Sequence, residues 1–437
     1  MATDIEKMYR QILVAPEDRD FQRILWRHSP SDSIREYRLN TVTYGLACAP
    51  FLAIRTLRQL ADDEETRFPR GAAVLRRDCY VDDIVTGAHS KQDAVVVQKE
   101  LRQLCTAGGF SLRKWSSNCP DILVGIPSDH CLLADSVSWK HEGHATLGLH
   151  WYPAEDAFSF SIKQRSISNY TKRSVLAETA RLFDPLGWLA PVVNRAKILI
   201  QSTWLQNLEW DAPLHPGDVQ QWQQFFQELP QLASIRVSRW VSGGDENSGF
   251  ELHGFADASE RGYAAVAYLR VAQTDGLRLH LLAAKTKVAP IKPVSLPRLE
   301  LCAASLLSDL IIHVRNTLSL FTAPVILWSD SKVTFDWIRG HASRWKTYVA
   351  NRVSRIQELL PEASWRHVPG RDNPADCASR GISPSELFKH PLWWTGPCWL
   401  SKDRTEWPSS SWEPATEQCC SWGRFFSRTR VGALVVK

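Results

Sequence analysis

The sequence predicts an α/β protein with roughly two to four domains, and three observations support this expectation. The chain of 437 residues is too long for a single hydrophobic core. Its hydrophobic fraction of 44% and its charged fraction of 23% are typical of a folded chain. Short strand-like runs are mixed with longer helical stretches, and this mixture predicts mixed sheets covered by helices.

Composition argues against several classes of protein. No run of about 18 uncharged apolar residues is present, so we expect no membrane partner. The N-terminal segment MATDIEKMYR carries charges where a signal peptide needs an apolar run, so we expect an intracellular protein, cytoplasmic or nuclear and not secreted. The 10 cysteines form no CxxC pair, which indicates reduced thiols and no zinc. A net charge of +5 permits nucleic-acid binding but does not argue for it.

Changes in the sequence pattern divide the chain into segments. The predicted segments are 1–151, 152–241, 242–249, 250–382 and 383–437. The first mixes strand-like runs with helices, the second is mainly helical, and the third, SGGDENSG, is a turn-rich linker. The fourth runs strand, strand, strand, helix, strand, helix, helix, which predicts a mixed sheet. The last is rich in proline, serine and tryptophan without periodicity, so we expect an irregular tail there.

Two adjacent aspartates, Asp82 and Asp83, lie between two β-prone runs. A tight hairpin prefers Asn-Gly or Asp-Gly at its tip, so Asp-Asp supplies little turn chemistry and brings like charges together. Divalent cations would offset that repulsion, and two-metal phosphoryl transfer needs carboxylates of this kind. Mg²⁺, or Mn²⁺, suits such a site because it takes oxygen ligands. On spacing alone, a solvated turn explains the pair equally well.

Other motifs surround this pair in a fixed order. Asp4 is followed five residues later by Tyr9, and the run Tyr44–Pro50 comes next. After the aspartate pair come Gly109–Trp115 and Thr146–Trp151. Taken alone, Asp4 is equally well explained as a helix cap and Tyr9 as a core aromatic.

The ordered motifs resemble the palm of reverse transcriptases, with the Asp82-Asp83 pair similar to the catalytic hairpin. The resemblance implies an RNA-directed DNA polymerase that binds a primer–template and dNTP, with Asp4, Asp82 and Asp83 as catalytic metal ligands. The residues implied to contact substrate are Tyr9, Tyr44, Gly45 and Lys114. Tyr9 would be the steric gate against a ribose 2′-hydroxyl. Because family members place the fingers upstream of the residue matching Asp4, we expect impaired polymerase activity from this chain.

A second set of acids lies in the segment 250–382. Asp257 and Asp330 each follow a predicted strand, and Glu300 and Asp376 each follow a proline that begins a predicted helix, Glu300 in the first turn. Each acid alone has an ordinary explanation as a cap, a turn residue or a first-turn acid. Brought together, the acids would repel one another until cations filled the cluster.

The order strand-Asp, helix-Glu, strand-Asp, helix-Asp resembles the four-carboxylate site of the RNase H fold. The run HVPGRDNPAD at 367–376 is similar to the closing motif of retroelement RNase H domains. The resemblance implies hydrolysis of the RNA strand of an RNA–DNA hybrid by two Mg²⁺ or Mn²⁺ ions, one activating water and one stabilising the leaving 3′-oxygen. His367 would lie on a mobile loop and help to release product or to position water, unless it is an ordinary surface histidine.

The middle of the chain carries further family features. The matching runs are Thr171–Arg173, Leu182–Gly187, Ala190–Pro191 and Trp204–Asp211. They resemble BEL/Pao retrotransposons, whose corresponding segment has been described as a peptidase. No Asp-Thr/Ser-Gly occurs in the chain, so an aspartic peptidase is only a distant alternative.

We therefore interpret 152–241 as thumb and connection helices that hold the primer–template. The run Leu392–Pro397 resembles the linker that precedes an integrase in these elements. The resemblance as a whole implies a retrotransposon Pol chain with a reverse-transcriptase palm, a helical thumb and connection, and a mixed-sheet RNase H-like domain. The alternative is a catalytically inactive nucleic-acid-binding remnant of such an element.

Overall fold

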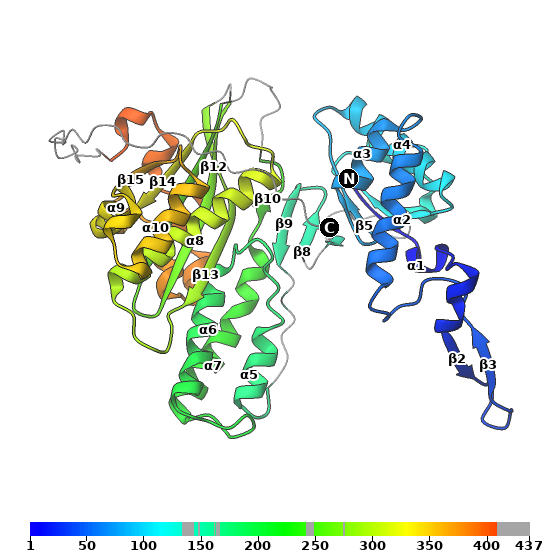
Figure 1. Ribbon diagram of the computed structural model, residues 1–437, viewed down its shortest axis with the longest axis horizontal. Helices are drawn as coiled ribbons and strands as arrows, with labels where there is room; N and C mark the ends of the chain where they lie inside the picture. Colours follow the sequence, from blue (N-terminus) through cyan, green and yellow to red (C-terminus); the bar gives the residue numbers. More distant parts are fainter. Residues whose placement is uncertain are drawn as a thin grey trace, which may run out of the picture.

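The computed structural model describes residues 1–132, 144–146, 149–160, 162, 167–241, 249–273 and 276–408. An N-terminal body and a larger C-terminal body are joined by a small connecting sheet (Figure 1). The predicted linker at 242–249, apart from Gly249, and the tail beyond Pro408 lie outside the described residues, as do Leu147 and Gly148. Within the described part of the chain, no helix combines the length and the apolar character needed to cross a membrane.

The N-terminal body is a four-stranded sheet in the order β4-β5-β1-β6, covered by helices. Its strands are β1 (Ala2–Ile5), β4 (Cys79–Tyr80), β5 (Asp83–Val85) and β6 (Leu112–Ser116). Its helices are α1 (Met8–Gln11), α2 (Ala49–Asp63), α3 (Pro69–Arg77) and α4 (Lys91–Ala107). Ser90 caps α4 by accepting a hydrogen bond from the Asp93 amide at 3.1 Å, and apolar residues at helical spacing then bury its inner face.

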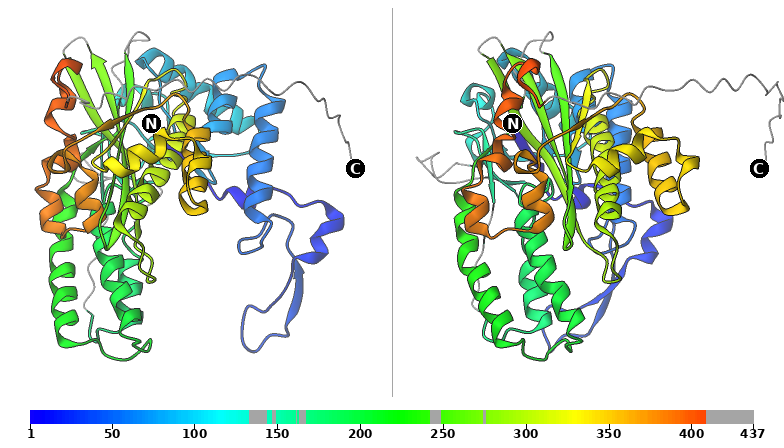
Figure 2. Two further views of the ribbon diagram at one scale, coloured as in Figure 1. Left: turned by 60° about the vertical axis from the view of Figure 1, so that its left-hand side comes forward. Right: turned by 90° about the vertical axis from the view of Figure 1, so that its left-hand side faces the viewer.

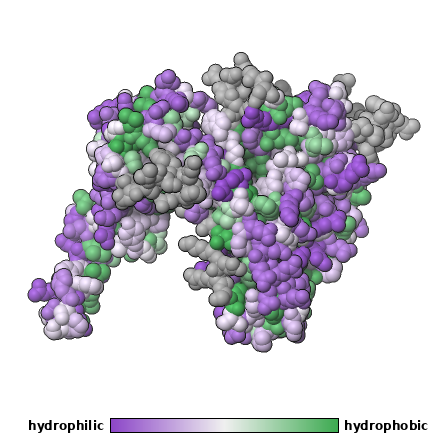
Figure 3. Space-filling view, turned by 180° about the vertical axis from the view of Figure 1, so that it is seen from behind, coloured by the Kyte–Doolittle hydropathy of each residue, from purple (hydrophilic) through white to green (hydrophobic). Residues whose placement is uncertain are grey.

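A two-stranded hairpin projects from this body (Figure 1). It consists of β2 (Arg23–Trp26) and β3 (Arg35–Arg38), and every residue of both strands is exposed. Leu25 is 72% exposed and Trp26 is 54% exposed. Figure 3 shows hydrophobic side chains interspersed with hydrophilic ones along this arm. The hairpin therefore forms with little help from the hydrophobic core.

The connecting sheet has the strand order β10-β9-β8-β7. Its strands are β7 (His144–Thr146), β8 (Leu149–Tyr152), β9 (Ala157–Phe160) and β10 (Val237–Ser238). Asp156 links it to the N-terminal body by accepting a hydrogen bond from Asn118 Nδ2 at 3.2 Å. The same carboxylate pairs with Arg239 at 2.6 Å, so the junction is polar.

The C-terminal body is built on a five-stranded sheet in the order β13-β12-β11-β14-β15. The strands are β11 (Phe250–Ala258), β12 (Gly262–Gln273), β13 (Gly276–Val288), β14 (Val325–Ser329) and β15 (Ser364–His367). β11, β12 and β13 are antiparallel neighbours, whereas β14 and β15 run parallel to β11. The helices among them are α8 (Leu296–Thr317), α9 (Lys332–Arg339), α10 (Thr347–Leu359) and α11 (Ala375–Arg380). The mixed α/β class is confirmed. The predicted order of elements is found as far as α10, but the strand β15 that follows it was not predicted.

Both faces of this sheet are buried, as alternate residues of one strand show. Leu252 and Ala256 of β11 pack in the core beneath α8. Phe255 points to the opposite face, where α6 and α11 lie. Figure 2 shows helices on both sides of the sheet. Because successive side chains of a strand alternate between faces, a strand buried on both sides needs an almost continuous apolar run.

The helices of the segment 152–241, predicted as thumb and connection helices, share a hydrophobic core with the sheet of the C-terminal body. They are α5 (Lys172–Thr179), α6 (Ala190–Leu205) and α7 (Pro216–Glu228). Their buried side chains belong to the same hydrophobic core as Phe255 and Trp328 of the sheet. They cover a sheet face that would otherwise expose large apolar side chains to water. The predicted boundary at 242–249 therefore does not separate two hydrophobic cores.

The run Leu182–Gly187 docks this helical segment against β13. The Leu186 carbonyl oxygen accepts a hydrogen bond from the Ala284 amide at 2.8 Å, and Trp188 Nε1 donates to the Leu282 carbonyl at 3.1 Å. Gly187 has a φ of +74°, and a Cβ atom there would lie only 1.8 Å from the Ala284 carbonyl oxygen. Glycine is therefore required at this position both for its conformation and for its space.

The residues after Ile382 are ordered in helices and turns, so the predicted irregular tail was wrong up to Pro408. They form α12 (Pro384–Phe388), α13 (Pro391–Thr395) and two 3₁₀ turns, Cys398–Ser401 and Arg404–Glu406. Trp393, Trp399 and Trp407 are 0%, 8% and 5% exposed and pack on the sheet face beside α6. Each tryptophan lies in a different short element, so the sequence shows no periodicity although the segment is buried.

A buried charge network fastens this C-terminal segment to the sheet. Glu251 accepts hydrogen bonds from Arg404 and from Arg270, the latter at 2.8 Å. His253 Nδ1 accepts from Trp328 Nε1 at 3.2 Å, so its proton lies on Nε2, which donates to Glu251 at 3.2 Å. Burial alone would raise the pKa of Glu251, but the hydrogen bonds from His253 and Arg404 and the charge of Arg270 lower it to about 2.

This network predicts an acid-sensitive contribution to stability. The pKa of Glu251 falls from an ordinary 4.5 to about 2 on folding, so its stabilisation is complete above pH 4.5 and is lost as the pH falls toward 2. We expect the difference in unfolding free energy between the wild type and Glu251→Gln to shrink by about 2 kcal/mol from pH 6 to pH 3. Urea unfolding at both pH values measures this change. The exposed Glu362→Gln is the control, and an unchanged difference for Glu251→Gln would contradict the assignment.

Candidate active sites

The first candidate site lies where β1 and β5 of the N-terminal body run side by side. Asp4 on β1 is paired directly across from Asp83 on β5. Asp82 lies in the turn before β5, and its carbonyl oxygen accepts a hydrogen bond from the Ile5 amide at 2.8 Å. Val81 has a φ of +56°, which turns the chain sharply at this point. The structure therefore brings Asp4, Asp82 and Asp83 together, while their role as metal ligands stays a prediction.

Lys114 lies beside this acidic group. Its Nζ donates to Asp4 Oδ2 at 2.8 Å, and this bond raises the pKa of Lys114. Burial raises the pKa of Asp83, repulsion from Asp82 and Asp4 raises it further, and Lys114 opposes the shift. The site thus concentrates negative charge that Lys114 partly offsets.

The aromatic residues predicted to contact substrate lie together. The rings of Tyr9, just after β1, and Tyr44, in the loop before α2, meet edge to face with their centroids 4.8 Å apart. Gly45 follows with a φ of +88°, a conformation that suits glycine. Tyr44 is exposed and Tyr9 is half-buried, so both rings border the surface.

The second candidate site lies at the ends of the neighbouring parallel strands β11 and β14. Their register pairs Ala256 with Ser329, which places the next residues, Asp257 and Asp330, side by side. Ligands of α/β sheets bind beyond the carboxyl ends of parallel strands because side chains from several strands converge there. Asp257 is only 6% exposed, and Asp330 is half-buried.

Two helices bring the remaining carboxylates to this edge. Glu300 lies on α8 and accepts a hydrogen bond from Ser331 Oγ at 2.5 Å. It is in the second turn rather than the predicted first turn, because α8 already begins at Leu296. Asp376 lies in the first turn of α11 and pairs with Arg380 Nε at 2.7 Å.

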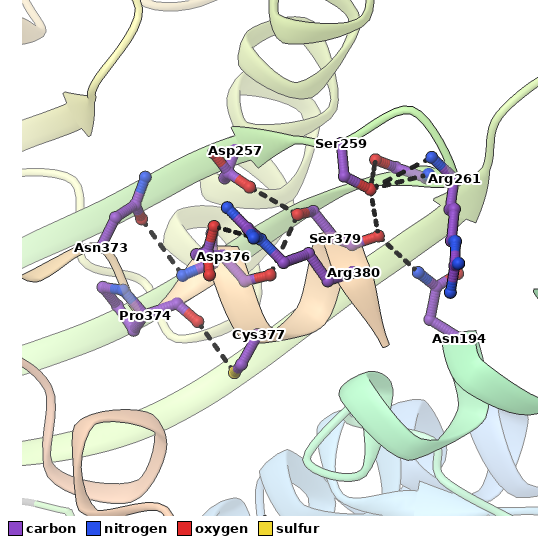
Figure 4. Close-up of polar contacts among 12 residues, drawn as sticks. Asn194, Asp257, Ser259, Arg261, Asn373, Pro374, Asp376, Cys377, Ser379 and Arg380 are labelled. Atoms are coloured by element: carbon purple, nitrogen blue, oxygen red, sulfur yellow. Dashed lines mark hydrogen bonds and ion pairs between the residues drawn. The ribbon is translucent and has the colours of Figure 1, made fainter. Parts of the chain in front are cut away.

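Helix α11 is tied directly to β11. Ser379 Oγ donates to Asp257 Oδ2 at 2.5 Å, as Figure 4 shows. At the other end of the helix, Asn373 Nδ2 donates to the Ala256 carbonyl at 3.0 Å, and Asn373 Oδ1 accepts from the Ala375 amide at 3.1 Å. The helix that carries Asp376 is therefore fixed to the strand that carries Asp257.

Burial and repulsion from neighbouring charges raise the pKa values of Asp257, Glu300 and Asp330. Burial raises the pKa of Asp257 to about 7, against the hydrogen bond from Ser379, and the charges of Asp330 and Asp376 raise it further. Burial also raises the pKa of Asp330, as does the charge of Asp376. For Glu300, burial raises the pKa and the charge of Asp330 adds to the shift. The carboxylates are thus electrostatic neighbours whose repulsion a bound cation would relieve.

His367 is the last residue of β15 and pairs in parallel register with Ser329. The predicted mobile loop was therefore wrong for this residue, because the edge strand stays paired with β14 up to this end of the sheet. The charge of His367 lowers the pKa of Asp330, against the larger effect of burial, so the two side chains are close. Its role in product release or water positioning stays a prediction.

Both sites offer oxygen ligands from carboxylates, which are the ligands that Mg²⁺ and Mn²⁺ take. Among the residues that the structure describes, no group of three or more His, Cys, Asp or Glu side chains is close enough to hold a metal ion as it stands. The chemistry of the donor set nevertheless fits a divalent cation, because buried and mutually repelling carboxylates gain from a cation between them. The residues that would hold it are those of the two acidic clusters, Asp4, Asp82 and Asp83, and Asp257, Glu300, Asp330 and Asp376.

Sequence reasoning missed several residues of the second site. Ser331 caps α9 by accepting a hydrogen bond from the Thr334 amide at 3.2 Å, but its bond to Glu300 was not foreseen. Ser379 was missed although its position three residues after Asp376 places both on one face of a helix. No local signal in the sequence points to Asn194, which reaches this region from α6.

Comparisons with known proteins agree with this architecture. Residues 171–331 match the family model described as Pao retrotransposon-like RNaseH-like domain. Among solved structures, the chain is similar to the foamy viral protease-reverse transcriptase in complex with RNA/DNA hybrid, with a TM-score of 0.53 and 11% sequence identity. The similarity covers 84% of this chain and 43% of that chain, so the chain spans less than half the length of that protein. No curated protein matches the chain.

The family match identifies an RNase H-like domain in residues 171–331, and the structural similarity shows that the fold of the chain resembles that of a reverse transcriptase. Residues 171–331 match the Pao retrotransposon-like RNaseH-like domain family, which supports the resemblance of this segment to Pao-type retrotransposon Pol proteins. The family match begins at α5 and runs across the predicted boundary at 242–249. It therefore groups the helices of 171–228 with the nuclease-like sheet, as their shared core does.

Proposed function

We propose that the C-terminal body is a ribonuclease H that hydrolyses the RNA strand of RNA–DNA hybrids. The observation that carries this proposal is the convergence of Asp257 and Asp330 at one edge of the sheet. Glu300 and Asp376 add negative charge from two helices, since the charge of Asp376 raises the pKa of Asp257 and the charge of Asp330 raises the pKa of Glu300. Burial of such a cluster has no evident structural benefit, since it costs free energy unless cations bind.

In this proposal Asp257, Glu300, Asp330 and Asp376 hold Mg²⁺ or Mn²⁺. When bound, the ions neutralise charge on the scissile phosphate and lower the pKa of a bound water. Ser379 orients Asp257, and Ser331 orients Glu300, through the short hydrogen bonds described above. His367, beside Asp330, helps to release the product or to position water.

We further propose that the N-terminal body is the palm of an RNA-directed DNA polymerase that takes a primer–template and dNTP. Asp4, Asp82 and Asp83 would hold the metal ions, as the adjacency of Asp4 and Asp83 in the sheet supports. Tyr9 acts as the steric gate beside Tyr44, whose ring it touches. Gly45 allows the backbone to approach the substrate, and Lys114 balances the charge of Asp4.

The nuclease proposal is tested with a labelled RNA–DNA hybrid and Mg²⁺. We expect cleavage of the RNA strand that falls at least about a hundredfold in Asp330→Asn, because losing one metal-binding carboxylate removes several kcal/mol of transition-state stabilisation. Asp83→Asn is the matched control, since it removes a carboxylate from the palm and leaves the nuclease site intact. A folded wild type that binds Mg²⁺ and leaves the hybrid uncut overturns the proposal. Primer extension on an RNA template tests the palm, with Asp83→Asn expected to lose it and Asp330→Asn to retain it.

A further inference from the structure

Helix α11, which carries part of the nuclease site, is short and depends on partners outside itself. It has six residues, too few for a helix that is stable alone. The last four carbonyl groups of a helix have no partner within it. Two of them, those of Ala378 and Ser379, accept hydrogen bonds from Asn194 Nδ2 at 2.8 and 3.1 Å. The Ser379 carbonyl also accepts from Ser259 Oγ at 2.9 Å, as Figure 4 shows.

The contact between α6 and α11 is tightly packed around Asn194. This side chain is 0% exposed, although asparagine is usually found at the surface. A Cβ atom on Gly262 would lie 2.8 Å from Asn194 Nδ2, and one on Gly381 would lie 2.8 Å from Arg195 Cα. Glycine at both positions leaves the space in which α6 and α11 meet, so a shift of α6 would be transmitted to α11.

The position of α11 determines where two parts of the nuclease site lie, the Asp376 carboxylate and the Ser379–Asp257 pair. Asp376 is one of the site's carboxylates, and Ser379 Oγ orients Asp257. Asn373 fixes the start of the helix to β11, but its last turn is fixed through the carbonyl groups that Asn194 satisfies. A displacement of about 1 Å in such a site costs about a hundredfold in rate.

We infer that Asn194 is a positioning residue of the nuclease site, acting from α6 through the last turn of α11 on Asp376 and on the Ser379–Asp257 pair. The helices of 171–228 are then part of the nuclease itself and do not serve as a separate support for the primer–template. This inference rests on the proposed ribonuclease function. It adds Asn194 to the residues on which hydrolysis depends, although Asn194 lies 184 positions in sequence from its hydrogen-bond partner, Ala378.

The test compares Asn194→Leu with Gln201→Leu in the full chain. Both changes remove a side-chain amide on α6, but Gln201 Nε2 donates to the Ala289 carbonyl at 2.8 Å and does not touch α11. For Asn194→Leu we expect kcat for hybrid cleavage to fall about tenfold to a hundredfold with KM changed less than about twofold. We also expect a smaller rise of Tm on addition of Mg²⁺, since the ligands of the cation are displaced. Gln201→Leu should keep the wild-type kcat and the wild-type response to Mg²⁺.

The outcomes separate positioning from simple support of the fold. Equal losses in both variants, or an unchanged kcat and Mg²⁺ response in Asn194→Leu, overturn the inference. If Asn194→Leu does not fold, Asn194→Ala carries the same comparison, because its smaller side chain leaves room for a water to bind the freed carbonyl groups. A wild type that binds Mg²⁺ without cutting hybrid overturns the ribonuclease proposal, whereas the Mg²⁺-dependent Tm of the variants still decides the role of Asn194.

Discussion

Asp257→Asn is expected to lower hybrid cleavage by at least about a thousandfold while raising the free energy of unfolding by about 1–3 kcal/mol in metal-free buffer. The two effects have one cause. Asp257 is almost fully buried among Asp330 and Asp376, so its negative charge is costly to the folded protein and useful only with a cation. Asparagine has a similar shape and keeps an oxygen that accepts the hydrogen bond from Ser379. The variant therefore loses the charge but not the packing.

The measurement is urea unfolding of both proteins with EDTA and with Mg²⁺, together with the hybrid cleavage assay. Mg²⁺ should stabilise the wild type and stabilise Asp257→Asn much less, because a ligand stabilises only the state that binds it. The control is Asp336→Asn, which removes an exposed carboxylate from α9 in the same body. A variant that is inactive and also markedly less stable would mean that Asp257 is a structural residue, contrary to this proposal.

Most strands of the larger sheet could be predicted from the sequence, because a strand is marked by a pattern of apolar residues within a short segment. The pattern of the segment 250–382 predicted the strand that carries Asp257 and the strand that precedes Asp330. The resemblance to reverse transcriptases grouped Asp82 and Asp83 with Asp4, and the structure pairs Asp4 with Asp83. For the strands, the relevant pattern spans fewer than about ten residues, which is the range over which periodicity is informative.

The partner of an amphipathic helix is not encoded locally. The spacing of apolar residues in α6 showed that one face would be buried, but not that the Phe255 face of the sheet would cover it. We therefore predicted thumb and connection helices without placing them against the sheet. Asn194, whose partners lie 184 and 185 residues away, had no visible role. The prediction for the segment after Ile382 was wrong for a related reason, since its buried tryptophans Trp393, Trp399 and Trp407 lie in or beside separate short helices and turns.

Ending the chain at Ile382 is expected to prevent stable folding of the C-terminal body. The deletion removes Trp393, Trp399 and Trp407, together with Leu387 and Leu400, all of them buried against the sheet. Burial of one large apolar side chain is worth about 1.5–3 kcal/mol, so their combined loss is about 8–15 kcal/mol. Since a typical domain is stable by only about 5–15 kcal/mol, the remaining body would unfold.

The decisive comparison is between chains that end at Ile382 and at Pro408. The second chain keeps the tryptophan contacts and the network of Glu251 with Arg404, so it should show a cooperative thermal transition that the first lacks. A single substitution tests the same contacts with a smaller loss of stability. Trp393→Ala, at a fully buried position, should lose about 3–5 kcal/mol, whereas Trp26→Ala on the exposed hairpin should lose little. A cooperative transition in the chain ending at Ile382 would contradict this prediction. It would show that the C-terminal body folds without the residues after Ile382, and that Arg404 and the tryptophans are not needed for its stability.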